Sequence, residues 1–93
     1  MVFSNEPGIY IEGSLGIRIE NIMVLKKDKK IKNNLCFEIL SHIPFERELF
    51  DFNILNKTEL DWINKYHTNV YERMNSKLKK DQRAWLKNAT LPI

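Results

Sequence analysis

The amino-acid sequence changes from a strand-like to a helix-like pattern near its middle. In the first half, short runs rich in β-branched and aromatic residues are separated by Gly, Asn, Asp and Lys, which is typical of β-strands. These runs lie at residues 2–4, 9–11, 17–25 and 35–40. The second half contains no glycine, and its apolar residues recur at three- and four-residue steps, which is typical of an amphipathic helix. The sequence therefore predicts an α+β chain, with a small antiparallel sheet followed by helices.

The helical half is predicted to contain two helices. Asn56 and Glu59 have the spacing of a capping box at the start of the first helix. A break at residues 75–76 precedes a shorter helix over residues 80–88, whose own apolar stripe consists of Trp85, Leu86 and Ala89. Pro44 prevents a helix through the centre of residues 41–52, so we expect an irregular crossing between the sheet and the helices. The apolar stripe of the first helix consists of Leu60, Ile63, His67, Val70 and Met74.

Length and charge exclude several classes of protein. With 93 residues the chain forms one small domain, and a large enclosed active site is not expected. No apolar run approaches the roughly twenty residues of a membrane helix. The net charge of +3 arises from 15 basic and 12 acidic residues, and the lysine-rich residues 26–32 are interpreted as a solvated loop between strands. Neither a membrane nor a nucleic acid is therefore predicted as a partner.

The cysteine content and the amino terminus indicate the compartment. Cys36 is the only cysteine and lies within an apolar run, which predicts a buried thiol in a reducing environment. The first eight residues lack the basic and apolar regions of a secretory signal. We therefore expect a cytoplasmic protein.

The segment from residue 4 to residue 21 holds the residues with most chemical potential. Pro7 and Gly8 favour an extended turn that presents Glu6 from a strand end. Strand alternation places Arg18 and Glu20 on one face, and a turn at residues 13–16 would bring Glu6 and Glu20 together. The repulsion between two adjacent carboxylates is often offset by a bound divalent cation. The spacing alone leaves both a metal site and a surface ion pair open.

Two motifs in this segment resemble those of a known family. Residues 4–10 read Ser-Asn-Glu-Pro-Gly-Ile-Tyr, and residues 16–21 read Gly-Ile-Arg-Ile-Glu-Asn. They closely resemble the last two metal-ligand motifs of the Xaa-Pro aminopeptidases, the aminopeptidase P branch of the M24 metallopeptidases. Residues 62–67, Trp-Ile-Asn-Lys-Tyr-His, and the end of the chain resemble the carboxy-terminal extension of that family. The resemblance covers nearly the whole chain.

The resemblance implies a fold, domains and an activity. Residues 1–40 would be the C-terminal strands of a pita-bread (creatinase-like) catalytic domain, and residues 41–93 the aminopeptidase P extension, with an irregular crossing and two helices. The family hydrolyses the N-terminal Xaa-Pro peptide bond with a hydroxide bridged by two divalent metals, commonly Mn²⁺. The expected substrate is a peptide with proline at its second position.

The resemblance also implies roles for three residues. Glu6 would be a metal ligand that also handles a proton of the attacking water, and Glu20 would be the bridging carboxylate. Arg18 would support the two carboxylates without binding the metal itself. Carboxylate oxygens suit hard ions such as Mn²⁺, although other divalent metals fit the same ligands. No substrate-binding residue is assigned.

One departure from the family limits what the chain does alone. The two Asp ligands and the metal-binding His of the family precede the Glu-Pro-Gly motif, and no such motif occurs here. His42 and His67 are not in equivalent motifs; His67 is expected to pack, or to cap a carbonyl, beside Trp62 and Tyr66. The chain is thus interpreted as a C-terminal fragment, inactive by itself, whose partner is the missing N-terminal half of the catalytic domain.

A non-catalytic interpretation is kept open. In it, the extension is an interaction or dimerisation module derived from the pita-bread fold, and Glu6 and Glu20 are relics. The aromatic residues of the helices, Trp62, Tyr66 and Trp85, are interpreted as core or docking residues in both cases. A homodimer is the further partner that such a surface would allow.

Overall fold

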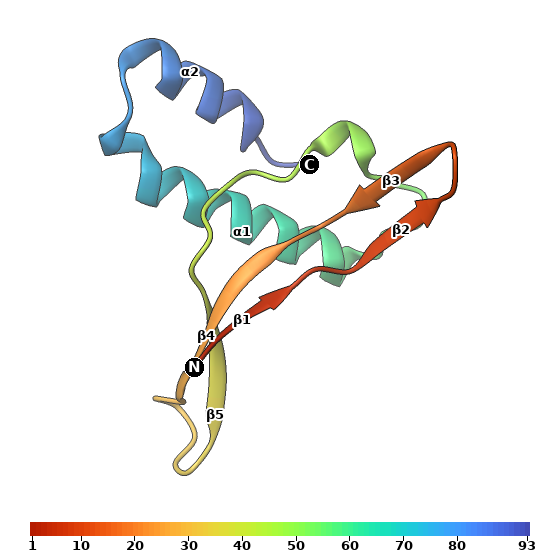
Figure 1. Cartoon of the computed structure of the whole chain (residues 1–93). Helices are drawn as coiled ribbons and strands as arrows, with labels where there is room; N and C mark the ends of the chain where they lie inside the picture. Colours follow the sequence, from red (N-terminus) through yellow and green to blue (C-terminus); the bar gives the residue numbers. More distant parts are fainter. The chain divides into compact units, whose positions relative to one another are not determined.

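The computed structural model describes all residues from Met1 to Ile93. The chain divides into two compact units, Met1–Ser41 and His42–Ile93, each of which is described by itself. The first unit contains strands and the second contains helices, so the predicted α+β class is confirmed (Figure 1). The sequence predicts the boundary between residues 40 and 41. No helix is long and apolar enough to cross a membrane.

The strands of the first unit all pair antiparallel. β1 (Val2–Asn5), β4 (Asn21–Lys27) and β5 (Leu35–Ile39) form a three-stranded sheet in the order β1-β4-β5. β2 (Gly8–Ile11) pairs with β3 (Leu15–Arg18) in a hairpin. Figure 1 shows β1 and β2 following one another along one arm of a long ribbon, and β3 and β4 along the other.

The prediction of one strand over residues 17–25 is wrong, because the structure divides it at Ile19 and Glu20. Pro7 lies across from this break and has no N–H to give to a strand ladder. The Ile19 N–H still donates to the Pro7 carbonyl at 3.0 Å. The two arms therefore stay together through the interruption.

The loop between β4 and β5 begins two residues after the start of the lysine-rich run. Lys26 and Lys27 belong to β4, so only the later lysines lie in the predicted loop. The Asp28 carboxylate accepts the N–H of Lys30 at 2.8 Å and closes the turn locally. Cys36, predicted as buried, is half-buried because β5 pairs on one side only.

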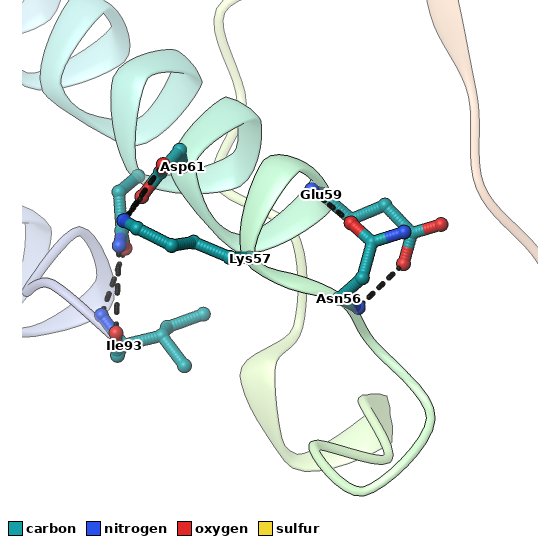
Figure 2. A network of polar contacts seen from close by, with 6 residues as sticks. Asn56, Lys57, Glu59, Asp61 and Ile93 are labelled. Atoms are coloured by element: carbon teal, nitrogen blue, oxygen red, sulfur yellow. Dashed lines mark hydrogen bonds and ion pairs between the residues drawn. The ribbon is translucent and has the colours of Figure 1, made fainter.

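The second unit begins with the predicted irregular crossing. Its one regular element before the helices is the short 3-10 helix η1 (Arg47–Leu49). The helix α1 (Lys57–Met74) then begins at Asn56, and the predicted capping box is present. Asn56 Oδ1 accepts the Glu59 N–H at 2.9 Å, and Glu59 Oε2 accepts the Asn56 N–H at 3.0 Å (Figure 2). This reciprocal pair satisfies two backbone donors that a helix start leaves free.

The core of the second unit lies on one face of α1. Its buried residues follow the i, i+3, i+4, i+7 spacing of a helix face, as predicted for most of the stripe. Leu60 and Met74, near the ends of the predicted stripe, are only half-buried. The buried residues are Ile63, Tyr66, His67 and Val70.

After the 3-10 helix η2 (Asn75–Lys77), α2 (Lys80–Ala89) contributes Leu86 to the core. Trp85, placed by the prediction in the apolar stripe, is 63% exposed. The reason is geometric: the buried face of α2 runs through Leu86 and Thr90, four residues apart, and Trp85 lies about 100° from Leu86 around the helix. Trp62 is also about half exposed (48%), so a core role holds for neither tryptophan.

The end of the chain is tied to α1 by a side-chain amide. Asn64 Oδ1 accepts the Ile93 N–H at 2.8 Å, and Asn64 Nδ2 donates to the Ile93 carbonyl at 3.4 Å. Figure 2 shows Ile93 beside α1, near the exposed ion pair of Lys57 with Asp61. Arg47 also donates to the Leu91 carbonyl. The last residues are thus part of the folded unit.

Candidate functional site

The register of the ribbon places two carboxylates opposite one another. Asn5 faces Asn21, and three residues further along each arm Gly8 faces Arg18. The same register therefore runs through the interruption between them, so Glu6 faces Glu20. Side chains of facing residues lie on the same side of a ribbon, and like charges in that position repel.

Arg18 contacts both carboxylates and offsets this repulsion. Its Nη2 lies 3.0 Å from Glu20 Oε2, and its Nη1 lies 3.7 Å from Glu6 Oε1. Glu20 first, and then Glu6, raise the pKa of Arg18 above its ordinary value. The three side chains are 38–49% exposed, so water still reaches them. The sequence-predicted site residues Glu6, Arg18 and Glu20 are thus brought together.

Tyr10 is a fourth member of this cluster and was not assigned a role from the sequence. It raises the pKa of Arg18 further, through its charge and a side-chain hydrogen bond, although both effects are smaller than those of the carboxylates. Its ring lies over Gly8 and Gly16: a Cβ added at Gly16 would sit 2.9 Å from Tyr10 Cδ1. The two glycines therefore leave the space that the Tyr10 ring fills.

A signal for Tyr10 is present in the sequence. Residues 6, 8 and 10 alternate onto the face that carries Glu6, and residues 16, 18 and 20 alternate onto the same face from the other arm. Two of these six positions are glycines, and an aromatic side chain commonly covers glycines in a sheet.

The cluster supplies part of a metal site. Oxygen donors of carboxylates suit hard divalent cations, and Glu6 Oε2 and Glu20 Oε1 lie outside the two ion pairs. The chain contains no group of three or more His, Cys, Asp or Glu side chains that could hold a metal ion. Further ligands would have to come from another polypeptide segment.

The two histidines lie outside this cluster. His42 is half-buried at the start of the crossing. His67 is fully buried in the second unit, packed beside Tyr66 as predicted, but its Nε2 accepts the N–H of Phe45 rather than capping a carbonyl. A neutral imidazole nitrogen without hydrogen can only accept, which explains the difference.

Comparison with known proteins gives a consistent set of relatives. A family profile described as the C-terminal region of peptidase M24 matches residues 33–93. The "Probable Xaa-Pro aminopeptidase P" of Coprinopsis cinerea is 42% identical over 101 aligned residues, covering 100% of this chain and 16% of that protein. The protein of the same name from Tuber melanosporum is 41% identical, with the same coverage.

A solved structure is similar to the fold as a whole. It is the crystal structure of X-prolyl aminopeptidase from Caenorhabditis elegans, described as a cytosolic enzyme with a di-nuclear active site. The TM-score is 0.81 at 33% identity, over 99% of this chain and 16% of that chain. The chain therefore spans about one sixth of the length of the relatives that it matches.

Proposed function

The chain belongs to the family of C-terminal regions of M24 peptidases, and we propose that it is the C-terminal portion of a metal-dependent Xaa-Pro aminopeptidase. Relatives about 40% identical across the full chain bear the name Xaa-Pro aminopeptidase P, which supports this proposal. In the proposed enzyme, the substrate is a peptide with proline at its second position. The N-terminal half of the catalytic domain is the partner of this segment, and the cytosol, where the Caenorhabditis elegans enzyme is described, is its compartment.

The observation that carries the proposal is the facing pair Glu6 and Glu20, held by Arg18. A facing pair of like charges is unfavourable in a ribbon unless cations offset it. Arg18 forms an ion pair with one oxygen of each carboxylate, and the other oxygen of each lies outside these ion pairs. These oxygens would hold divalent metal ions such as Mn²⁺. The similar solved enzyme is described as having a di-nuclear active site, which supports a metal site here.

The residues of the cluster have separate roles in the proposed reaction. Bound divalent ions supply Lewis acidity and a water molecule of lowered pKa. Glu6 would bind metal and accept a proton from the attacking water at its carboxylate, and Glu20 would bind metal from the opposite arm. Arg18 touches neither substrate nor metal; it fixes the orientation of both carboxylates through its ion pairs, and Tyr10 in turn fixes Arg18.

A chimaeric enzyme tests the proposal. This chain would replace the matching C-terminal segment of the Coprinopsis cinerea relative, and hydrolysis of an Xaa-Pro peptide and bound metal would be measured. We expect an active chimaera in which Glu6→Gln or Glu20→Gln lowers kcat/KM by more than about 100-fold and reduces metal content, because each change removes an anionic ligand. Glu12→Gln, in the exposed turn between β2 and β3, is the matched control and should leave both readouts unchanged.

Two results would contradict the proposal. A well-folded chimaera with full activity in either Gln variant would remove Glu6 or Glu20 from the metal site. A well-folded chimaera without activity, next to an active parent enzyme, would favour the non-catalytic interaction module instead.

A further inference from the structure

His67 is a buried titratable group that the proposed function does not use. Its side chain lies on α1 at 0% exposure, beside the rings of Tyr66 and Phe45, whose centroids are 5.8 and 6.0 Å from its own. The Phe45 N–H donates to His67 Nε2 at 3.0 Å. Because Nε2 accepts this bond, the imidazole is neutral and carries its hydrogen on Nδ1, which has no partner in the protein.

The hydrogen bond of His67 helps to fasten the crossing to α1. The Tyr66 hydroxyl makes another such contact, because it donates to the Ile43 carbonyl at 2.7 Å. The rings of Phe45 and Tyr66 also stack, with centroids 4.5 Å apart. Burial raises the pKa of Tyr66 above 10.0, so its hydroxyl keeps its hydrogen near neutral pH. Unlike the Tyr66 contact, that of His67 can change with a proton between about pH 5 and pH 8.

A proton on His67 would oppose the contacts that surround the ring. Both nitrogens of an imidazolium are donors, so the Phe45 N–H would lose its acceptor in a buried position. The new charge would also repel Arg47, which lies on η1 in the same crossing. The neighbouring carboxylates offer no compensation: Glu46 and Glu48 are exposed, and the Glu46 carboxylate already accepts the Glu48 N–H.

We propose that the hydrogen bond between His67 and Phe45 is a pH-sensitive latch, and that protonation of His67 releases residues 43–47 from α1. Burial first, and then the charge of Arg47, lower the pKa of His67 below its ordinary value of 6.5 while the latch is closed. In the open form the ring is solvated and binds a proton more tightly. The latch is therefore fully stable above about pH 6.5, and its stability decreases as the pH falls below that value.

Amide exchange at Phe45 in the full 93-residue chain tests the latch. The exchange rate, divided by the intrinsic rate at each pH, gives the population of the open form. We expect this population to rise by up to about tenfold for each pH unit below about 6.5, because the open form then gains a proton. The amides of the α1 core, such as Val70, should stay protected.

Two variants identify the group that titrates, because the chain contains only two histidines. His67→Gln retains a side-chain oxygen that can accept the Phe45 N–H but does not titrate, so its exchange should not depend on pH. His42→Gln should behave like the wild type. The proposal is overturned if His67→Gln opens with acid as the wild type does, or if wild-type Phe45 is equally protected at about pH 7.5 and about pH 5.5.

A measurement without substitution at His67 covers the case in which His67→Gln does not fold. The ring-proton signals of the wild type and of His42→Gln assign the titration of each histidine. The His67 signal should titrate below 6.5, together with the opening of Phe45. Titration of His67 at or above 6.5, or at a pH where Phe45 does not open, would overturn the latch.

Discussion

At the scale of single residues, Asn64 shows how one amide can order a chain end. Its two polar atoms form a donor and an acceptor contact with the backbone of Ile93, which lies 29 positions later in the sequence. An amide side chain offers an acceptor oxygen and a donor nitrogen on separate atoms, so it matches a backbone N–H and C=O pair, whereas a carboxylate can only accept. Arg47 holds the neighbouring Leu91 carbonyl. These contacts tie the last residues to α1 and η1.

We predict that Asn64→Ala loosens the end of the chain. Loss of the two hydrogen bonds should lower the free energy of unfolding by about 0.5–1.5 kcal/mol for the stronger bond and less for the longer one. The free energy of opening at the Ile93 amide, measured by hydrogen exchange, should fall by at least as much as the free energy of unfolding of the chain. Asn69→Ala is the control, since Asn69 is exposed on the same helix. Equal effects of the two substitutions on stability and on Ile93 would contradict the assigned role of Asn64.

At the scale of secondary-structure elements, α2 presents two neighbouring residues in opposite environments. Leu86 is 2% exposed and Trp85 is 63% exposed. The hydrophobic contribution of a residue follows the area that it removes from water, not its size. The smaller residue is therefore the one that fastens α2 to the core.

We predict that Leu86→Ala destabilises the chain by about 2–5 kcal/mol, because it leaves a cavity in the core. Trp85→Ala should change the free energy of unfolding by less than about 0.5 kcal/mol. Urea denaturation of the two variants, followed by circular dichroism, measures both effects. A larger loss for Trp85→Ala than for Leu86→Ala would show that the indole is buried by contacts outside this structure.

Local sequence patterns predicted the elements well and their long-range partners poorly. The capping box of α1 is a pattern within four residues, and it was found from the sequence. The division between β3 and β4 depends on Pro7 across the ribbon, and the partner of His67 is Phe45, 22 positions away. Periodicity could not exclude Trp85 from the stripe, because the burial of a helix face is decided by what packs against it.

The candidate site followed the same rule. The proximity of Glu6 and Glu20 was predicted because a hairpin with a turn at residues 13–16 determines its own register. The contact of Arg18 with both carboxylates is a choice of side-chain rotamer, which strand alternation does not specify. The covering of two glycines by Tyr10 was missed because it involves both arms of the ribbon.

At the scale of the whole molecule, the ribbon of the first unit leaves much apolar surface exposed to water. The face opposite the carboxylates is apolar along its length, and its large side chains are 38–70% exposed. Exposed apolar surfaces of this kind mark places where another segment packs. The residues concerned are Phe3, Ile9, Ile11, Leu15, Ile17 and Ile19. We expect the N-terminal half of the catalytic domain to cover this face in the proposed enzyme.

The carboxylate face is incomplete in the same way. Glu6 and Glu20 with water can hold one hard cation weakly, but two ions at a short separation need more anionic and imidazole ligands. No group of three or more ligating side chains exists in the chain to provide them. A substrate also needs walls that fix its proline and its reacting bond, since misplacement of reacting atoms by even 1 Å or so costs about two orders of magnitude in rate.

We therefore predict that the 93-residue chain alone does not hydrolyse an Xaa-Pro peptide, even with Mn²⁺ in excess. The chimaeric enzyme is the positive control, because it contains the same Glu6 and Glu20 together with the segments that supply the remaining ligands. The Glu6→Gln variant of the chain, purified in parallel, is the negative control. Turnover by a contaminating peptidase would be equal in both preparations, whereas turnover by the chain itself would not. Metal-dependent hydrolysis that is present in the wild-type chain and absent in Glu6→Gln would contradict the prediction. Since the chain has only two carboxylates at the site, such activity would require ligands from a second copy, and it would then increase more steeply than linearly with protein concentration.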